Sequence, residues 1–202
     1  MLVYSLADFL RSVAINRHQR YLLFLGAGAS ITSGIPGVEE CILDLKKRIY
    51  LSHNPSSRES HLPLGLKFAQ EKIQKFLIDN SIVPPPGESD YSYYIRTCYP
   101  SAKDRQLFFK ELTHGKSPSY GYKLIPLLAD NKLIDSVWTT NFDGLAAKSV
   151  ASSTEIRSIE IGHDCVDRLN VPYDERELKC VSLHGDYRYD LSLIHISEPT
   201  RP

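Results

Sequence analysis

Three polar turns in this sequence carry residues that can bind a nucleotide or move a proton, and each follows a short segment that is expected to be a strand. The first turn is residues 26–36 (GAGASITSGIP), the second is 139–143 (TTNFD), and the third is 183–186 (LHGD). In α/β proteins, ligands bind outside the carboxyl ends of parallel strands. The sequence therefore predicts that these three turns meet at one site.

The glycine-rich turn has the composition of a phosphate-binding loop. Gly26 and Gly28 lack a Cβ, so the backbone can bring its N–H groups against a phosphate, and Ser30 and Thr32 add hydroxyl donors. The dehydrogenase pattern GxGxxG is absent, because Ile31 stands at its third glycine and no acidic residue ends a second strand about 20 residues later. The Gly-Lys-Ser/Thr ending of a P-loop is also absent. A purely structural strand-to-helix turn is the alternative interpretation.

The other two turns supply an amide, a carboxylate and an imidazole. Asn and Asp at a strand end are often only helix caps, an interpretation that is as good as a functional one for Asp143 but explains Asn141 less well. His184, beside a glycine, can exchange a proton near neutral pH, although a lone histidine is more often structural. None of the three turns identifies a function alone.

Taken together and in this order, GAGAS with SGIP, TTNFD and LHGD resemble the motifs of the sirtuin superfamily, over residues 21–186. This resemblance implies an extended Rossmann-like fold with NAD as substrate. It implies that Asn141 and His184 are catalytic at the nicotinamide–ribose bond, with Thr140 facing the ribose and Asp143 the carboxamide. The NAD-binding residues that it implies are Gly26, Ala27, Gly28, Ala29, Ser30, Gly34, Ile35, Pro36, Thr140 and Asp143.

Two departures separate this chain from the protein-deacylating sirtuins. Those enzymes follow GIP with Asp-Phe-Arg, whereas Gly37, Val38, Glu39 and Glu40 stand here. They also carry a four-cysteine zinc module, but the four cysteines here are far apart and form no CxxC pair, so we expect reduced thiols and no metal. The remaining pattern resembles zinc-free, sirtuin-like domains of bacterial antiphage systems. The expected function is an NAD+ glycohydrolase that releases ADP-ribose and nicotinamide; the alternatives are an NAD-dependent protein deacylase and a non-catalytic module that binds NAD or ADP-ribose.

The antiphage resemblance also implies a larger parent protein. Such domains are usually fused to a sensor or oligomerisation domain, so we expect a C-terminal partner domain and a homo-oligomeric parent. Residues 191–202 (LSLIHISEPTRP) resemble a translated sequencing adapter. We therefore expect a sirtuin-like domain at 1–190 and a non-native tail after Asp190 or Leu191.

Composition limits the other classes of function. A chain of 202 residues with 42% hydrophobic residues is expected to form one domain. Acidic and basic residues number 24 each and are scattered, so nucleic acid is not an expected ligand. No stretch approaches the roughly 18 apolar residues that span a bilayer, and no secretion signal is visible. We expect a soluble, cytoplasmic protein that does not bind membranes.

The alternation of strands and helices predicts an α/β fold, Rossmann-like, with a largely parallel sheet flanked by helices and a helical insertion at about 51–116. Expected strands are at residues 21–25, at the start of 133–143, in 153–162, and in 178–186 with its end at His184. Expected helices are at residues 2–13, 37–50, 64–79, 102–112 and 144–150.

Several local details carry predictions of their own. The wholly apolar run 21–25 (YLLFL) predicts a strand buried on both faces. Ser117 followed by Pro118 predicts the N-cap and first position of a further helix, which Pro126 would kink. Residues 51–61 are expected to be a loop, and the segment 91–99 is ambiguous between helix and strand.

Overall fold

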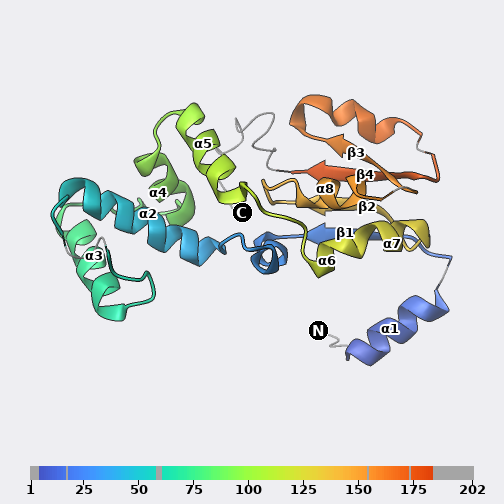
Figure 1. Cartoon of the computed structure of the whole chain (residues 1–202), viewed down its shortest axis with the longest axis horizontal. Coiled ribbons are helices and arrows are strands. Elements are labelled where there is room, and N and C mark those ends of the chain that lie inside the picture. Colours follow the sequence, from blue (N-terminus) through green and yellow to red (C-terminus); the bar gives the residue numbers. More distant parts are fainter. Residues whose placement is uncertain (1–4, 17, 58–60, 154, 173, 184–202) are drawn as a thin grey trace.

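A computed structural model describes residues 5–16, 18–57, 61–153, 155–172 and 174–183. It has an α/β architecture in which four strands form one all-parallel sheet flanked by helices (Figure 1). The predicted Rossmann-like α/β class is therefore confirmed. The strands, in their spatial order, are β1 (Tyr21–Leu25), β2 (Ile134–Thr139), β4 (Glu177–Ser182) and β3 (Arg157–Ile161).

One face of the sheet is covered by three short helices, α6 (Tyr120–Lys123), α7 (Ile125–Asp130) and α8 (Leu145–Ala151). Fully buried Val137, Val150 and Leu178 lie in the core between these helices and the strands. On the opposite face, the 3₁₀ segment η3 (His163–Asn170) packs against β3. Lys179 of β4 holds it there by donating from Nζ to the carbonyl of Leu169, 2.7 Å away.

Strand β1 differs from its prediction. Tyr21, Leu23 and Leu25 pack against the core, but Leu22 is 51% exposed and Phe24 is 59% exposed. β1 lies at an edge of the sheet, and none of the described elements covers its outer face. The prediction of burial on both faces was wrong, because an apolar run shows that one face is buried without showing that the second is covered.

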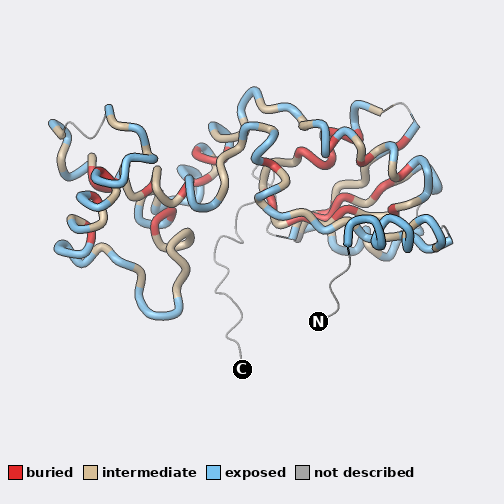
Figure 2. Tube along the Cα trace, turned by 90° about the horizontal axis from the view of Figure 1, so that it is seen from below, coloured by how far each residue is buried: buried red, intermediate tan, exposed pale blue. Residues whose placement is uncertain are grey.

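Four helices form a separate helical lobe at the other end of the molecule (Figure 1). They are α2 (Val38–His53), α3 (Lys67–Asp79), α4 (Asp90–Cys98) and α5 (Ala102–Thr113). Leu45, Leu77 and Ile95 are at the centre of this lobe and are fully buried. Figure 2 shows the buried residues gathered in two groups, one in the helical lobe and one around the sheet.

The sequence patterns fitted most of the helices, with two differences of detail. The ambiguous segment 91–99 belongs almost entirely to α4, whose N-cap Ser89 accepts a hydrogen bond from the backbone N–H of Ser92. Helix α2 continues three residues beyond Tyr50, into the segment expected to be a loop. Its extra turn is supported by Asn54, which donates to the Tyr50 carbonyl.

The helix predicted from Ser117 begins later than expected. Its N-cap is Ser119, so the prediction of an N-cap at Ser117 was wrong. The Ser119 backbone N–H donates to the Ser33 hydroxyl at 3.0 Å. This bond ties the residues before α6 to the glycine-rich turn, so they do not join the helix. The predicted effect of Pro126 is confirmed, because α6 stops at Lys123 and α7 starts at Ile125.

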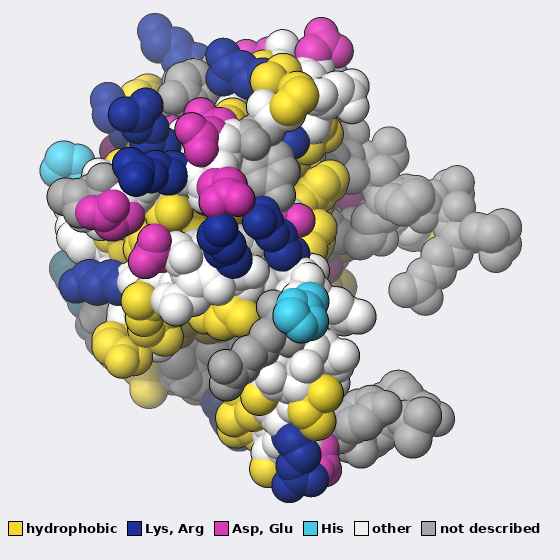
Figure 3. All heavy atoms as spheres, turned by 90° about the vertical axis from the view of Figure 1, so that its right-hand side faces the viewer, with side chains coloured by type: hydrophobic (Ala, Val, Ile, Leu, Met, Phe, Trp, Pro, Cys, Tyr) yellow, Lys and Arg dark blue, Asp and Glu magenta, His cyan; other side chains and the backbone are white. Residues whose placement is uncertain are grey.

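At the N-terminus, α1 (Leu6–Ile15) is capped by Ser5, and none of its residues is buried. No helix in the described part of the chain combines the length and apolar character needed to cross a membrane. On the face drawn in Figure 3, lysine and arginine side chains lie among aspartate and glutamate side chains.

Candidate functional site

Strands β1, β2 and β4 end at the same edge of the sheet, as the sequence predicted. Two backbone hydrogen bonds continue the ladder past the strand ends: Thr140 N–H donates to the Leu25 carbonyl at 3.1 Å, and Leu183 N–H donates to the Thr139 carbonyl at 2.9 Å. The parallel register aligns the last residues of the three strands, Leu25, Thr139 and Ser182. The residues that follow these positions therefore share one edge.

A cavity of about 290 Å³ opens at this edge, between the sheet and the helical lobe. The strand-end turns form one wall, and helices α2, α4 and α5 form the other. Its lining residues are Ala27, Ser30, Ile35, Pro36, Val38, Cys41, Tyr91, Phe109, Leu112, Thr113, Thr140, Asn141, Phe142 and Asp143. The structure thus brings together seven of the twelve residues singled out from the sequence.

Asn141 is held by its amide nitrogen. Nδ2 lies 2.9 Å from the Gly26 carbonyl, 3.0 Å from Ser30 Oγ and 3.3 Å from the Tyr122 hydroxyl, and the residue is only 7% exposed. Since a carbonyl can only accept a hydrogen bond, the nitrogen must be the atom that faces Gly26. Oδ1 has no hydrogen-bond partner among the described residues, so an acceptor remains available at the cavity wall.

Ser30 and Asp143 form the floor of the same cavity. The Ser30 hydroxyl donates to Asp143 Oδ2 at 2.5 Å, and Asp143 Oδ1 accepts from the Leu145 N–H at 2.9 Å. This second bond satisfies an N–H group in the first turn of α8. The N-cap of α8 is Gly144, so Asp143 supports the start of the helix from the position before the cap, and it lines the cavity as well.

The residue beneath these groups is Tyr122, whose role the sequence did not indicate beyond a helix face in the core. Its side chain is 3% exposed, and its hydroxyl lies 2.9 Å from Ser30 Oγ. Burial raises the pKa of the Tyr122 phenol, and the nearby Asp143 carboxylate raises it further. The phenol therefore stays protonated at neutral pH and is a hydrogen-bond donor.

The first part of the glycine-rich turn is open toward the outside. It forms the 3₁₀ helix η1 (Ala27–Ser33) directly after β1. A Cβ added at Gly26 would meet only Thr140 Oγ1, at 3.9 Å, and one added at Gly28 would meet nothing within 4 Å. The chain itself therefore does not require glycine here for space, and a ligand can approach this backbone closely.

The end of the turn requires glycine for a structural reason. Gly34 has a φ of +79°, in the left-handed region, and a Cβ there would lie 3.1 Å from the Lys116 ammonium. The Thr32 hydroxyl, which the sequence suggested as a phosphate donor, donates to Ser119 Oγ at 3.0 Å. It ties the turn to the segment before α6.

The apolar wall of the cavity comes from the helical lobe, and no motif in the sequence indicated it. Phe109 of α5 packs on Phe142 of the TTNFD motif, with ring centroids 4.7 Å apart. Val38 lines the cavity, while Glu39 and Glu40 lie exposed in the first turn of α2. These carboxylates stabilise the N-terminus of α2 through the helix dipole, and they do not line the cavity.

Cys41 is the thiol in this apolar wall. Burial, with smaller effects of Asp44 and Glu40, raises its pKa to about 11, so it stays a neutral thiol near pH 7. All four cysteines are free. No group of three or more His, Cys, Asp or Glu side chains that could hold a metal ion occurs in the described part of the chain.

The remaining predicted residues lie at or beyond the margin of the cavity. The Gly26 carbonyl accepts a hydrogen bond from Asn141, and Ala29 packs against the core between the sheet and its helices. Gly28 and Gly34 do not line the cavity. His184 and residues 191–202 lie outside the described residues, so the assignment of His184 stays a prediction. Strand β4 ends at Ser182, two residues before the predicted end.

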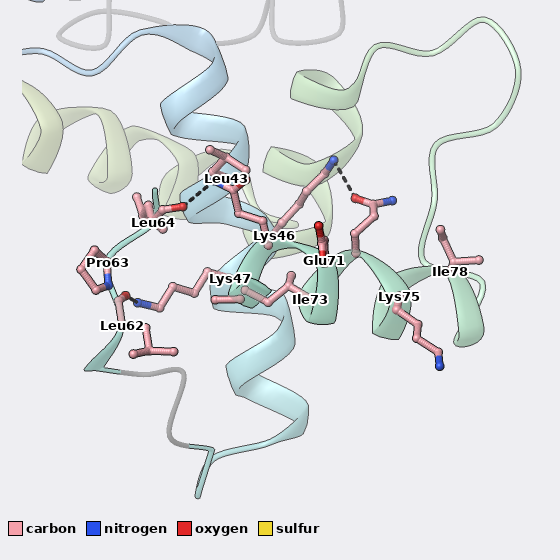
Figure 4. A pocket seen from close by; sticks show the side chains of 13 residues that line it. Leu43, Lys46, Lys47, Leu62, Pro63, Leu64, Glu71, Ile73, Lys75 and Ile78 are labelled. Carbon is pink, nitrogen blue, oxygen red and sulfur yellow. Dashed lines mark hydrogen bonds between the residues drawn. The ribbon is translucent and has the colours of Figure 1, made fainter. Parts of the chain in front are cut away.

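A larger cavity of about 510 Å³ lies within the helical lobe, between α2 and α3 (Figure 4). Two of its three lysines are engaged within the chain: Lys46 donates to Asp90 and Gln74, and Lys47 donates to the Leu62 carbonyl. No strand ends there, and none of the three motifs contributes to it. The cavity at the strand ends is therefore the better candidate for a reaction.

Comparison with known proteins adds no family assignment: no protein-family model matches the chain, and no curated protein is similar enough to count as a match. The resemblance to sirtuins is therefore an interpretation of the three motifs and of the edge that they share.

Proposed function

We propose that this chain is a sirtuin-like NAD+ glycohydrolase that cleaves the bond between nicotinamide and ribose. The observation that carries the proposal is the state of Asn141: its amide nitrogen is anchored to the Gly26 carbonyl, and its Oδ1, at the cavity wall, has no hydrogen-bond partner among the residues that the structure describes. A free amide oxygen at a strand end suits the orientation of a water molecule or a ribose hydroxyl.

The size of the cavity supports binding of one end of a dinucleotide. Ligand pockets are typically about 300–1,000 Å³, so a cavity of about 290 Å³ suits a single ring with part of a ribose. The Phe109–Phe142 pair offers an apolar surface to a planar ring, and Asp143 offers an acceptor for a carboxamide. The pyrophosphate would follow the open backbone at Gly26 and Gly28.

The proposed reaction is a substitution at the anomeric carbon of the ribose. The bond from C1′ to the nicotinamide nitrogen breaks, and its electron pair leaves with nicotinamide, which becomes neutral. Positive charge then develops on the ribose, where the Asn141 Oδ1 dipole and the Asp143 carboxylate favour it electrostatically. Water adds its oxygen to C1′ and loses a proton, which gives ADP-ribose. His184 is the proposed acid and base.

The wider setting is part of the same proposal. NAD consumption would serve antiphage defence within a longer, oligomeric protein whose sensor domain lies outside this chain. The cavity does not support a protein deacylase. Deacylases have Asp-Phe-Arg after GIP, whereas in this chain Gly37 and Val38 follow that motif, and Val38 lines the cavity. A module that only binds NAD needs no unpartnered amide oxygen beside the proposed C1′ position.

The test is to incubate the purified chain with NAD and to follow nicotinamide and ADP-ribose by chromatography. Asn141→Ala is expected to lower the rate at least a hundredfold, since it removes both the anchor and the acceptor. Asn80→Ala is the matched control, because Asn80 caps α3 in the helical lobe through a bond to the Phe76 carbonyl. An equal rate in wild type and Asn141→Ala would disprove the assignment; acyl transfer from an acetylated peptide would establish the deacylase, and NAD binding without turnover the binding module.

A further inference from the structure

A buried tyrosine with no assigned role lies directly beneath the site. We propose that Tyr122 is a positioning residue that sets the orientation of the Asn141 amide, and so keeps Oδ1 turned toward the substrate. The catalytic part of this inference rests on the proposed NAD+ glycohydrolase function. The orientation of the amide can be tested without it.

The direction of each hydrogen bond follows from counting protons. An ionised Asp143 can only accept, so the single Ser30 hydroxyl proton points to Asp143 Oδ2. The Tyr122 hydroxyl must then donate its own proton to Ser30 Oγ, 2.9 Å away. Asn141 Nδ2 donates one proton to the Gly26 carbonyl and directs the other between Ser30 Oγ and the Tyr122 oxygen.

This arrangement leaves a single orientation for the amide. A rotation of Asn141 by half a turn would place Oδ1 against the Gly26 carbonyl, which has no proton to donate. It would also set Oδ1 against Ser30 Oγ, whose proton is already used by Asp143. The terminal torsion of an asparagine has only broad intrinsic preferences, so its hydrogen-bond partners decide the orientation.

Tyr122 helps to fix the orientation of the Asn141 amide. Its proton occupies one Ser30 lone pair, which leaves the other for Asn141, and its own oxygen accepts the same amide proton at 3.3 Å. The ring is held by the core around Ile125 and Val150, so the hydroxyl has little freedom to move. Without this hydroxyl, Ser30 has a free acceptor site and the amide loses one of its three partners.

The catalytic test compares Tyr122→Phe with Tyr94→Phe. Both changes remove one hydroxyl from a buried ring, but the Tyr94 hydroxyl bonds to the Ile82 carbonyl in the helical lobe. For Tyr122→Phe we expect kcat for NAD hydrolysis to fall about tenfold, with KM for NAD within about twofold, at a temperature where both variants are fully folded. Tyr94→Phe is expected to keep the wild-type kcat. An unchanged kcat in Tyr122→Phe would overturn the role of the tyrosine in the reaction.

The second test needs no catalysis. The Asn141 side-chain NH₂ pair, identified in ¹H–¹⁵N spectra by its loss in Asn141→Ala, is expected to exchange slowly with solvent in the wild type and at least tenfold faster in Tyr122→Phe. Equal exchange in both proteins would overturn the positioning role. If the wild type releases no nicotinamide, the glycohydrolase proposal fails, and the exchange measurement still decides whether Tyr122 positions the amide.

Discussion

The same chemical change at two glycines of one turn is expected to have opposite consequences. Gly28→Ala adds a methyl group where nothing lies within 4 Å and where φ is not in the left-handed region. A glycine-to-alanine change at such a position leaves stability unchanged or raises it by about 0.4–1 kcal/mol, because the unfolded chain loses freedom. The methyl group would nevertheless fill the space through which a pyrophosphate approaches the backbone.

Gly34→Ala adds the same methyl group where the backbone forbids it. With φ at +79°, an alanine costs roughly 1–2 kcal/mol. The contact with Lys116 Nζ at 3.1 Å adds little, because that atom is the flexible end of its side chain. In a protein of this size 1 kcal/mol shifts Tm by about 2–4 °C, so a decrease of roughly 2–8 °C is expected.

The assay pairs thermal unfolding with NAD kinetics, below the Tm of every variant. Gly28→Ala is expected to unfold at or above the wild-type Tm and to raise KM for NAD at least tenfold. Gly34→Ala is expected to unfold earlier and to change KM by less than twofold. A wild-type KM in Gly28→Ala would show that the open turn is not a phosphate site. A wild-type Tm in Gly34→Ala would refute the backbone argument.

Two further predictions concern the wall of the cavity and the buried thiols. Phe109→Ala, which removes a ring 4% exposed and packed on Phe142, is expected to cost about 3–5 kcal/mol in urea unfolding. Leu107→Ala on the same helix, where the side chain is 49% exposed, should cost less than about 0.5 kcal/mol. Burial raises the pKa of Cys41 and of Cys98 from 9.0 to about 11, so the neutral thiols stabilise the fold below pH 9, and that stability is lost as pH rises toward 11. Tm should therefore fall between pH 8.5 and 10.5, and a Tm that rises over this interval would contradict the raised pKa values of the two thiols.

The parallel sheet could be predicted because its strands carry local signals. YLLFL ends abruptly in glycine, and the segments before TTNFD and LHGD are short and end in polar turns. The number of covered faces could not be predicted, because Leu22 and Phe24 are as apolar as Leu23, which is only partly buried against the core. That difference depends on whether another element packs on β1, which is a property of the tertiary arrangement and not of the strand itself.

The polar half of the cavity could be predicted for the same reason as the sheet. Three strand ends meet at one edge, so the residues after Leu25, Thr139 and Ser182 had to be neighbours. The apolar half could not, because Phe109 lies in a helix whose pattern only marks it as buried. Its position opposite Phe142 depends on how the helical lobe packs against the sheet.

The hydrogen bonds change what the polar residues of the motifs are able to do. The resemblance to sirtuins implies that Ser30 and Asp143 are direct ligands of NAD, but the Ser30 proton is bound to Asp143, and Asp143 also accepts from the Leu145 N–H at the start of α8. Both are therefore first of all supports. Within the described part of the chain the amide oxygen of Asn141 has no hydrogen-bond partner, which is why substrate orientation should depend on it more than on any hydroxyl in the glycine-rich turn. The effect of Asn141→Ala on kcat should accordingly exceed that of Ser30→Ala, and the reverse order would contradict this assignment of roles.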